Sequence, residues 1–306
     1  MRLVFFSTAL LVFASRALAA DTPAGANALV GVVDFHSHSA PDTVSRSLNS
    51  FAVVRQAKAA GMRGVVLKNH FMPTAALAQL AMQEAGGIEV FGGIALNLSN
   101  GGLNAEAVRR MVQVDGHRGK IVWLPTFDAE NQVRFSKQER AFVSVVGKDG
   151  RPAAALAEIF QLIAANDLIL ASGHSSTAET LILFEAARAA GVKRLLVTHA
   201  LSDSTRASLE QMKHFAAQGA VMEFAYLTHL PAPLGQGVPV AECVRAIHAV
   251  GAEHFLISSD LGQANTPVHT DGLRAFLAAL KAEGATEREI DLVARKNPAR
   301  LLGLEP

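Results

Sequence analysis

Cysteine is almost absent from the sequence, since Cys243 is the only one among its 306 residues. A single cysteine cannot form a disulfide within the chain, so the core alone must stabilise the fold. A lipid anchor on a cysteine at a signal cleavage site is excluded as well, because Cys243 lies far from the N-terminus. With 50% hydrophobic residues, the chain has ample material for such a core.

An excess of charge is also missing. Lys and Arg total 28 against 27 for Asp and Glu, and the basic residues are scattered along the chain. We therefore expect no nucleic-acid partner and no attraction to an anionic membrane. No linker rich in proline or glycine divides the chain, which favours one domain over residues 20–306.

The N-terminus has the features of a secretory signal peptide. Residues 1–19 combine an early arginine, an apolar run that is short for a bilayer span, and small residues before the expected cleavage site. The alternative is an uncleaved N-terminal anchor. We expect removal of residues 1–19, no integral membrane segment in the mature protein, and a periplasmic or secreted location.

The rest of the sequence alternates between short apolar runs and longer alanine-rich segments with helical spacing. Apolar runs of this kind suit the strands of a parallel sheet that is covered on both faces. Eight strand–helix units predict an α/β fold, a (βα)8 TIM-type barrel. An open doubly wound sheet is the alternative, but no glycine-rich phosphate-binding motif follows the first strand. The eight runs read LVGVVDFH, RGVVLKNH, IEVFGGIALN, KIVWLPTF, DLILASGH, RLLVTHA, AVMEFAYL and HFLISSD.

Two segments lie outside this repeat. Residues 134–152 lengthen the loop after the fourth strand, and the stretch AFVSVVGKDG within it predicts a small hairpin with an Asp-Gly turn. Residues 286–304 predict an extra amphipathic helix at the C-terminus.

Polar residues that suit metal binding stand at the ends of the predicted strands. The carboxyl ends of barrel strands are where such proteins assemble their chemistry. Buried imidazoles and a carboxylate need partners, and a metal ion supplies a partner to all of them at once. The residues are His36 and His38 (first strand), Lys68 and His70 (second), His174 (fifth), His199 (sixth) and Asp260 (eighth).

Three further charged residues are weaker candidates for metal or substrate contact. Glu223 lies in the apolar seventh strand, where a buried carboxylate must meet a metal, Lys68 or a hydroxyl group. A structural ion pair is the alternative for Glu223. Asp42 and Arg46 follow the first strand, and Arg46 could hold a carboxylate or phosphate group.

The pattern of strand-end ligands on an eightfold barrel resembles the amidohydrolase superfamily of metal-dependent hydrolases. The stretches HSHSAPD, LKNHFMPT and FGGIALN resemble one branch of that superfamily, for which the resemblance names no substrate. The resemblance implies that His36, His38 and Asp260 hold a divalent metal. It implies that His174 joins this metal or, with His199, holds a second one, so one or two ions are expected. Neutral imidazoles and a carboxylate suit zinc.

The sequence departs from the family at the fourth strand. Members with two metals commonly have a carboxylated lysine at the end of that strand, where this sequence reads WLPTF. Lys120 stands at the start of the strand, at the wrong end of the barrel. Lys68 could replace the missing group, or could remain an ammonium that binds a carboxylate or the substrate.

The resemblance implies an enzyme that uses a metal-activated water on an amide, lactone, ester or related bond of a small molecule. Asp260 would take the proton during attack and pass it to the leaving group. Three alternatives remain open: a phosphoesterase of the polymerase-and-histidinol-phosphatase type, a decarboxylase on the same scaffold, and a non-catalytic periplasmic metal-binding protein. The sequence also leaves open the oligomeric state, including a homo-oligomer.

Overall fold

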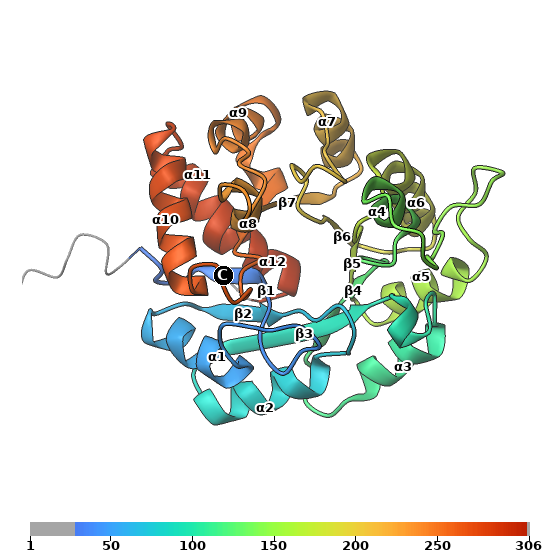
Figure 1. Cartoon of the computed structure of the whole chain (residues 1–306), viewed down its shortest axis with the longest axis horizontal. Helices are drawn as coiled ribbons and strands as arrows, with labels where there is room; N and C mark the ends of the chain where they lie inside the picture. Colours follow the sequence, from blue (N-terminus) through green and yellow to red (C-terminus); the bar gives the residue numbers. More distant parts are fainter. Residues whose placement is uncertain (1–27, 305–306) are drawn as a thin grey trace, which may run out of the picture.

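Eight parallel strands form one sheet in which each strand pairs with the next one along the chain, and helices surround them (Figure 1). The computed structural model describes residues 28–304, so the predicted signal peptide lies outside the described residues. The strands are β1 (Val33–Ser37), β2 (Gly64–Leu67), β3 (Glu89–Ala95), β4 (Gly119–Trp123), β5 (Ile169–Ala171), β6 (Arg194–Val197), β7 (Val221–Ala225) and β8 (Phe255–Ser258).

The two ends of the sheet meet between β8 and β1. Ser37 forms a parallel bridge with Leu261, just beyond β8. The Asp260 N–H donates to the His36 carbonyl at 2.7 Å, and the His38 N–H donates to the Leu261 carbonyl at 2.8 Å. The sheet is therefore a nearly closed barrel, as predicted, and the open-sheet alternative is wrong.

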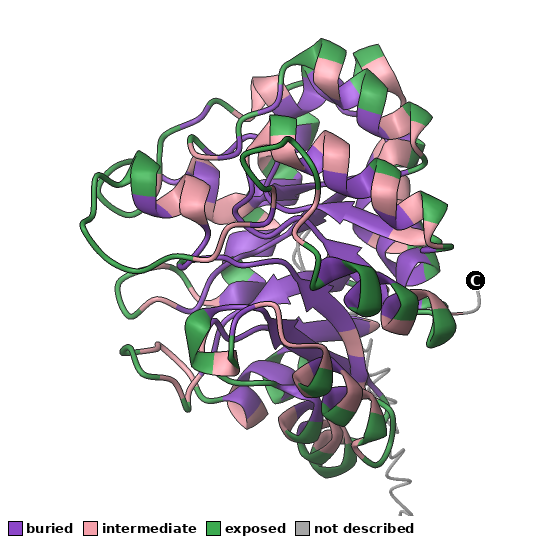
Figure 2. Ribbon diagram, turned by 90° about the vertical axis from the view of Figure 1, so that its right-hand side faces the viewer, coloured by how far each residue is buried: buried purple, intermediate pink, exposed green. Residues whose placement is uncertain are grey.

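A long helix follows each strand and packs on the outside of the barrel. Figure 2 shows the buried strands in the centre and helices whose outer faces are exposed. Ser176 and Ser208 begin two of these helices with reciprocal side-chain caps, in which each serine pairs with the third residue of its helix. The helices are α1 (Ser50–Ala59), α2 (Ala75–Ala85), α3 (Ala105–Gln113), α5 (Leu156–Ala165), α6 (Thr177–Ala189), α7 (Leu209–Ala217), α9 (Ala241–Val250) and α10 (His269–Ala282).

Shorter helices occupy the loops and the C-terminus. The segment predicted as a hairpin has one antiparallel bridge, Val146 to Pro152, around a turn at residues 147–150. The C-terminal segment is helical in three consecutive pieces, and the middle one is a π-helical turn. The short elements are η1 (Leu98–Asn100), α4 (Glu130–Phe135), α8 (Tyr226–His229), η2 (Ala252–His254), α11 (Glu287–Asp291), η3 (Leu292–Lys296) and α12 (Asn297–Leu302).

The apolar core has two parts. The larger part lies between the strands and the surrounding helices. The smaller part draws on all eight strands, includes Phe35 and Trp123, and is joined by Leu301 and Leu302 of α12. This second cluster is the filling of the barrel, and it ends below the polar residues at the carboxyl ends of the strands.

An irregularity in β1 directs the first histidine into the barrel. The pairing of β1 with β2 shifts register between Asp34 and Ser37. Phe35 belongs to the interior cluster, and the ring of its neighbour His36 lies 6.4 Å from that of Trp123, so both residues face the interior. Bulges of this type commonly redirect a side chain beside a functional site. Asp34 does not join the histidines but accepts hydrogen bonds from the Ser259 N–H (2.8 Å) and hydroxyl (2.6 Å).

We expect Asp34→Ala to lower the free energy of unfolding by about 3 kcal/mol, because it leaves the buried Ser259 N–H unpaired and takes the shorter of two acceptors from the Ser259 hydroxyl at the β1–β8 junction. Urea unfolding in the presence of a chelator measures this loss without a contribution from bound metal. Asp115→Ala, at an exposed loop position, is the matched control and should change stability by less than about 0.5 kcal/mol. Equal stability of the two variants would show that Asp34 does not hold the junction together.

Candidate metal centre

Three side chains at the carboxyl ends of β1 and β8 converge on one point. His36 Nε2 lies 3.0 Å from Asp260 Oδ1, and His38 Nε2 lies 3.1 Å from the same oxygen. The two Nε2 atoms are 3.2 Å apart. Ligand atoms around a tetrahedral zinc are about 3.4 Å from one another, which follows from Zn–N bonds of about 2.1 Å. Among residues 28–304, these are the three residues that the geometry groups as a metal site.

The backbone at this point is held in an uncommon conformation. Asp260 has φ +52° and His199 has φ +30°, two of the few non-glycine residues with positive φ in the described chain. Gly262 follows at φ +125°, and a Cβ there would lie 2.0 Å from the His38 carbonyl oxygen. Only glycine permits this close approach of the β8 loop to β1, which brings Asp260 to the histidines.

Glu223 of β7 lies behind the first histidine. Its Oε1 is 3.0 Å from His36 Nδ1 and accepts from the Ser258 hydroxyl at 2.7 Å, while its Oε2 accepts from the His199 N–H at 3.0 Å. With the His36 proton held on Nδ1, the lone pair on Nε2 faces the metal position. Glu223 thus meets a hydroxyl, as one prediction allowed, and contacts His36 rather than Lys68.

Electrostatics at this point favour a cation. Burial raises the pKa of Glu223, but His36 outweighs it and brings that pKa to about 2. Burial also raises the pKa of Asp260, yet His36 and His38 hold it well below its usual value. Conversely, burial lowers the pKa of His36, while Asp260 and Glu223 raise it above its ordinary value. The two carboxylates are therefore ionised at neutral pH and draw positive charge to His36.

The other predicted histidines line the same cavity without joining this group. The rings of His174 and His199 are 4.9 Å apart, and the His199 ring is 6.3 Å from that of His36. Burial lowers the pKa of His199 to about 4 and those of His70 and His174 well below the ordinary value. In His38, which belongs to the group, burial lowers the pKa to about 3. These four imidazoles are neutral at physiological pH, which is the form that binds metals.

Asp42 and Arg46 lie at the site rather than in solvent. Both Nε and Nη2 of Arg46 are 2.7 Å from Asp42 Oδ2, and the two side chains are almost completely buried. Nη2 of Arg46 is also 3.4 Å from Nδ1 of His38. The ion pair therefore fixes a guanidinium beside the second histidine.

Lys68 enters the cavity just after β2. Its Nζ is buried without a hydrogen-bond partner among the described residues and lies 5.3 Å from the centre of the Trp123 ring. Burial lowers its pKa to about 8, although Asp260 and Glu223 act in the opposite direction. Lys120 is not at the site but pairs with Asp167 at 3.7 Å, near the start of β4.

All the predicted strand-end residues line one cavity of about 290 Å³. No role was predicted from the sequence for Phe127, whose ring lines the cavity and stacks on the His70 ring with their centres 4.0 Å apart. The prediction likewise missed the other residues that complete the lining: Val44, Ser202, Leu227, Thr228 and Gln263.

A buried network after β3 and β4 fixes His70. Asn97 Nδ2 donates to the His70 carbonyl and to the Thr126 hydroxyl, both at 2.7 Å, and Thr126 Oγ1 lies 2.8 Å from His70 Nδ1. Sequence inspection could have found Asn97, because it ends the third apolar run just as the histidines end others.

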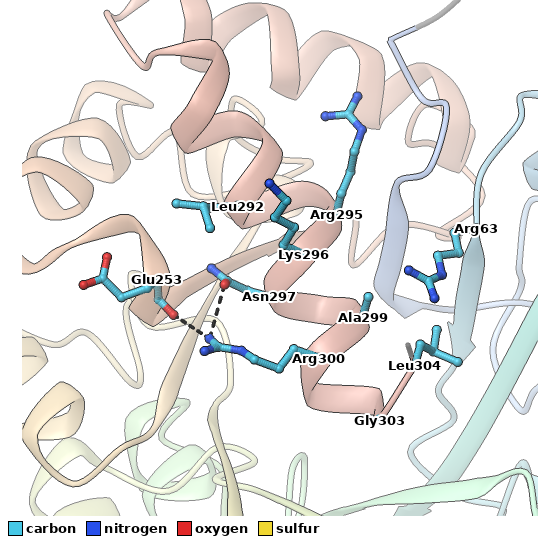
Figure 3. A pocket seen from close by; sticks show the side chains of 10 residues that line it. All are labelled: Arg63, Glu253, Leu292, Arg295, Lys296, Asn297, Ala299, Arg300, Gly303 and Leu304. Atoms are coloured by element: carbon cyan, nitrogen blue, oxygen red, sulfur yellow. Dashed lines mark hydrogen bonds between the residues drawn. The ribbon is translucent and has the colours of Figure 1, made fainter. Parts of the chain in front are cut away.

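A larger cavity of about 520 Å³ lies beside η3 and α12, at the opposite end of the barrel (Figure 3). Its lining includes Arg295, Lys296 and Arg300 but only one carboxylate, Glu253, and no histidine. Arg300 donates to the Glu253 carbonyl at 2.9 Å, and Arg295 to the Val30 carbonyl at 2.7 Å. Because size alone does not make a metal site, the smaller cavity with its ligand atoms is the candidate.

The residues present fit a divalent metal. Two imidazole nitrogens and a carboxylate oxygen at mutual distances of 3.0 to 3.2 Å form a donor set that zinc accepts. The carboxylate behind His36 supplies the outer support that metal-binding histidines usually have. His174 Nδ1 is buried without a hydrogen-bond partner, which leaves a further nitrogen donor in the same cavity.

Comparison with known proteins identifies a family for the sequence and similar solved structures for the fold. The model of the family of unknown function DUF6282 matches residues 31–223, and no curated protein matches the chain. The barrel is similar to an amidohydrolase from Pseudomonas aeruginosa, with a TM-score of 0.62, 12% identity and coverage of 92% of this chain and 98% of that one.

Two further solved structures support the same fold. The values for organophosphorus hydrolase from Deinococcus radiodurans are a TM-score of 0.60 and 15% identity, over 90% of this chain and 94% of that one. An amidohydrolase from Burkholderia multivorans has a TM-score of 0.58 and 15% identity, with coverage of 90% of this chain and 99% of that one. The predicted resemblance to amidohydrolases is thus confirmed for the fold. In the described part of the chain, no helix has the length and apolar character of a membrane span.

Proposed function

The chain belongs to DUF6282, a family of unknown function, and we propose from the geometry of its site that it is a metal-dependent hydrolase of small molecules. The observation that carries this proposal is the convergence of His36, His38 and Asp260 in a cavity at the carboxyl ends of the strands. Solved structures with the same fold include proteins named as amidohydrolases and an organophosphorus hydrolase, which supports the proposal.

His36, His38 and Asp260 would hold the metal, for which zinc is the best match to the donors. A divalent ion there would supply Lewis acidity, polarising the bond to be broken and lowering the pKa of water. His174 and His199 line the same cavity and would complete this site or hold a second ion.

The chain's own residues would move the proton. Asp260 is ionised, because His36 and His38 hold its pKa low, so its carboxylate can accept a proton from the attacking water. The same carboxyl group can then return the proton to the leaving amine or alcohol. Glu223 keeps the His36 proton on Nδ1, so the first histidine remains a ligand and does not take part in proton transfer.

We also propose that the protein works in the periplasm or outside the cell. The support for this location is the signal-like sequence of residues 1–19.

The proposed function is tested on full-length protein stripped of metal by a chelator and reloaded with Zn²⁺. We expect Zn²⁺ to bind and to restore hydrolysis of at least one class in a panel of amides, lactones, esters, dipeptides and aryl phosphates. The chelated protein should be inactive on the same substrate. Tight binding of Zn²⁺ without turnover of any class would instead favour the non-catalytic metal-binding alternative, and release of CO₂ from aromatic acids would favour the decarboxylase.

A further inference from the structure

The buried Lys68 ammonium lacks a hydrogen-bond acceptor in the described part of the chain. Its Nζ is buried, has no hydrogen-bond partner among residues 28–304 and lies 5.3 Å from the centre of the Trp123 ring. A buried polar group without a partner is costly, and an ammonium group has three donors to satisfy. Because Lys68 lines the candidate cavity, a bound molecule can supply the acceptor.

Arg46 is a second buried cation at the same cavity. Its side chain is 4% exposed and lines the cavity, with Nη2 3.4 Å from His38 Nδ1. A guanidinium has five N–H donors, more than its contacts with Asp42 Oδ2 and His38 Nδ1 use, so it can also donate to a bound anion. Asp42 keeps Arg46 in place from its other side.

The balance of charge points to an anion with a single negative charge. Asp260, Lys68 and Arg46 line the cavity. The carboxylates of Glu223 and Asp42 lie directly behind it, in contact with His36 and Arg46. With neutral imidazoles and a divalent metal, the three carboxylates and two side-chain cations would leave one net positive charge. A carboxylate neutralises that excess, whereas a doubly charged phosphate exceeds it.

We propose that the substrate is a small organic carboxylate whose charged group is bound by Lys68 and Arg46. This inference rests on the proposed function and specifies its substrate class. The volume of about 290 Å³ limits the bound molecule to a small one. The Phe127 ring lines the same cavity and would contact the apolar part of the substrate. Lys68 and Arg46 determine specificity, and the metal position is left for the bond that is cleaved.

The fluorescence of Trp123 can report this binding. Trp123 is the only tryptophan in the sequence, and it lies beside both Lys68 and His36. We expect benzoate to give a saturable change in the tryptophan fluorescence of the Zn²⁺-loaded full chain. Benzyl alcohol, which has the same ring without the charge, should bind at least about tenfold more weakly.

Three variants locate the binding site. Lys68→Met and Arg46→Met should each weaken benzoate binding by about tenfold or more, since each removes a charged donor from a buried site. Lys296→Met, which removes a cation from the larger cavity at the other end of the barrel, should have no effect. Metal content is measured in every sample, so that loss of the metal is not mistaken for loss of the anion site.

A stability measurement supports the test for Lys68. Because its ammonium group has no acceptor in the free protein, Lys68→Met should unfold at the same or a higher urea concentration than the parent chain. A less stable variant would mean that Lys68 has a structural partner, and the inference would fail for this residue.

Other results would overturn the proposal. Equal affinity for benzoate and benzyl alcohol would do so, as would weaker binding in Lys296→Met alone. A ¹³C carbamate signal after addition of labelled bicarbonate, absent in Lys68→Met, would show an anionic carboxylated lysine and exclude Lys68 as the anchor. Benzoate binding that needs Lys68 and Arg46, without hydrolysis of any substrate, would sustain the inference while counting against the proposed function.

Discussion

Replacement of Asp260 by Asn is expected to lower kcat for the hydrolysed substrate by about 10²- to 10⁴-fold while the barrel stays folded. The amide has nearly the same shape as the carboxylate, so an oxygen can remain at 3.0 and 3.1 Å from His36 and His38. An amide cannot accept the proton of the attacking water, however, and it carries no charge to hold a cation. The loss of kcat therefore comes from proton transfer together with weaker metal binding.

These two effects are separated by measuring kcat at saturating Zn²⁺, with the metal content of each sample determined alongside. Asp271→Asn is the matched control, because it is the same substitution at an exposed position in the first turn of α10. Its kcat should equal that of the parent chain. If Asp260→Asn holds a full complement of metal and keeps the parent kcat, Asp260 is not the proton acceptor.

Replacement of either histidine of the first strand should remove the metal together with the activity. His36→Asn or His38→Asn leaves two of the three converging ligand atoms, and zinc sites need three or more protein ligands to hold the ion. We expect a metal content near zero after dialysis and a loss of activity of about 10³-fold or more, because water activation depends on the ion. His214→Asn, an exposed substitution on α7, should retain both metal and activity.

Glu223→Gln should weaken Zn²⁺ binding without abolishing it. The amide can still contact His36 and Ser258 but loses the negative charge that draws the proton to His36 Nδ1. The affinity for Zn²⁺ should fall by about 10- to 100-fold, far less than after loss of a ligand. Zn²⁺ titration followed by Trp123 fluorescence, and the rise in Tm on metal addition, measure both changes. If Glu223→Gln and the parent chain bind Zn²⁺ equally, the carboxylate has no role in the metal site.

The strands and helices of the barrel could be predicted because each one carries a local signal. Each of the eight apolar runs contains an observed strand to within one residue, and the alanine-rich segments overlap the eight outer helices. The irregularity in β1 could not be predicted, since a register shift depends on how β1 pairs with the separate strand β2. In a regular strand, Asp34 would share a face with the histidines, whereas the structure places it in the junction.

The candidate site was only partly predictable for a related reason. The position of a residue at a strand end is a property of the sequence, so His36, His38 and Asp260 could be named as neighbours. The contacts of Glu223, Arg46 and Phe127 depend on loop paths and on side chains from other strands, about which a single sequence is silent. Arg46 shows this most clearly, because a loop position gave no sign that Asp42 would bury it beside His38.

By itself, the sequence determined the eightfold alternation and put ligand-type residues at the strand ends, because periodicity and residue order are local. Tertiary structure alone decided which atoms meet. The positive φ of Asp260, the glycine beyond it and the bulge in β1 bring Asp260, His36 and His38 within 3.2 Å of one another. It also left the Lys68 ammonium without an acceptor, since burial and partners are properties of the packed barrel and not of residue order.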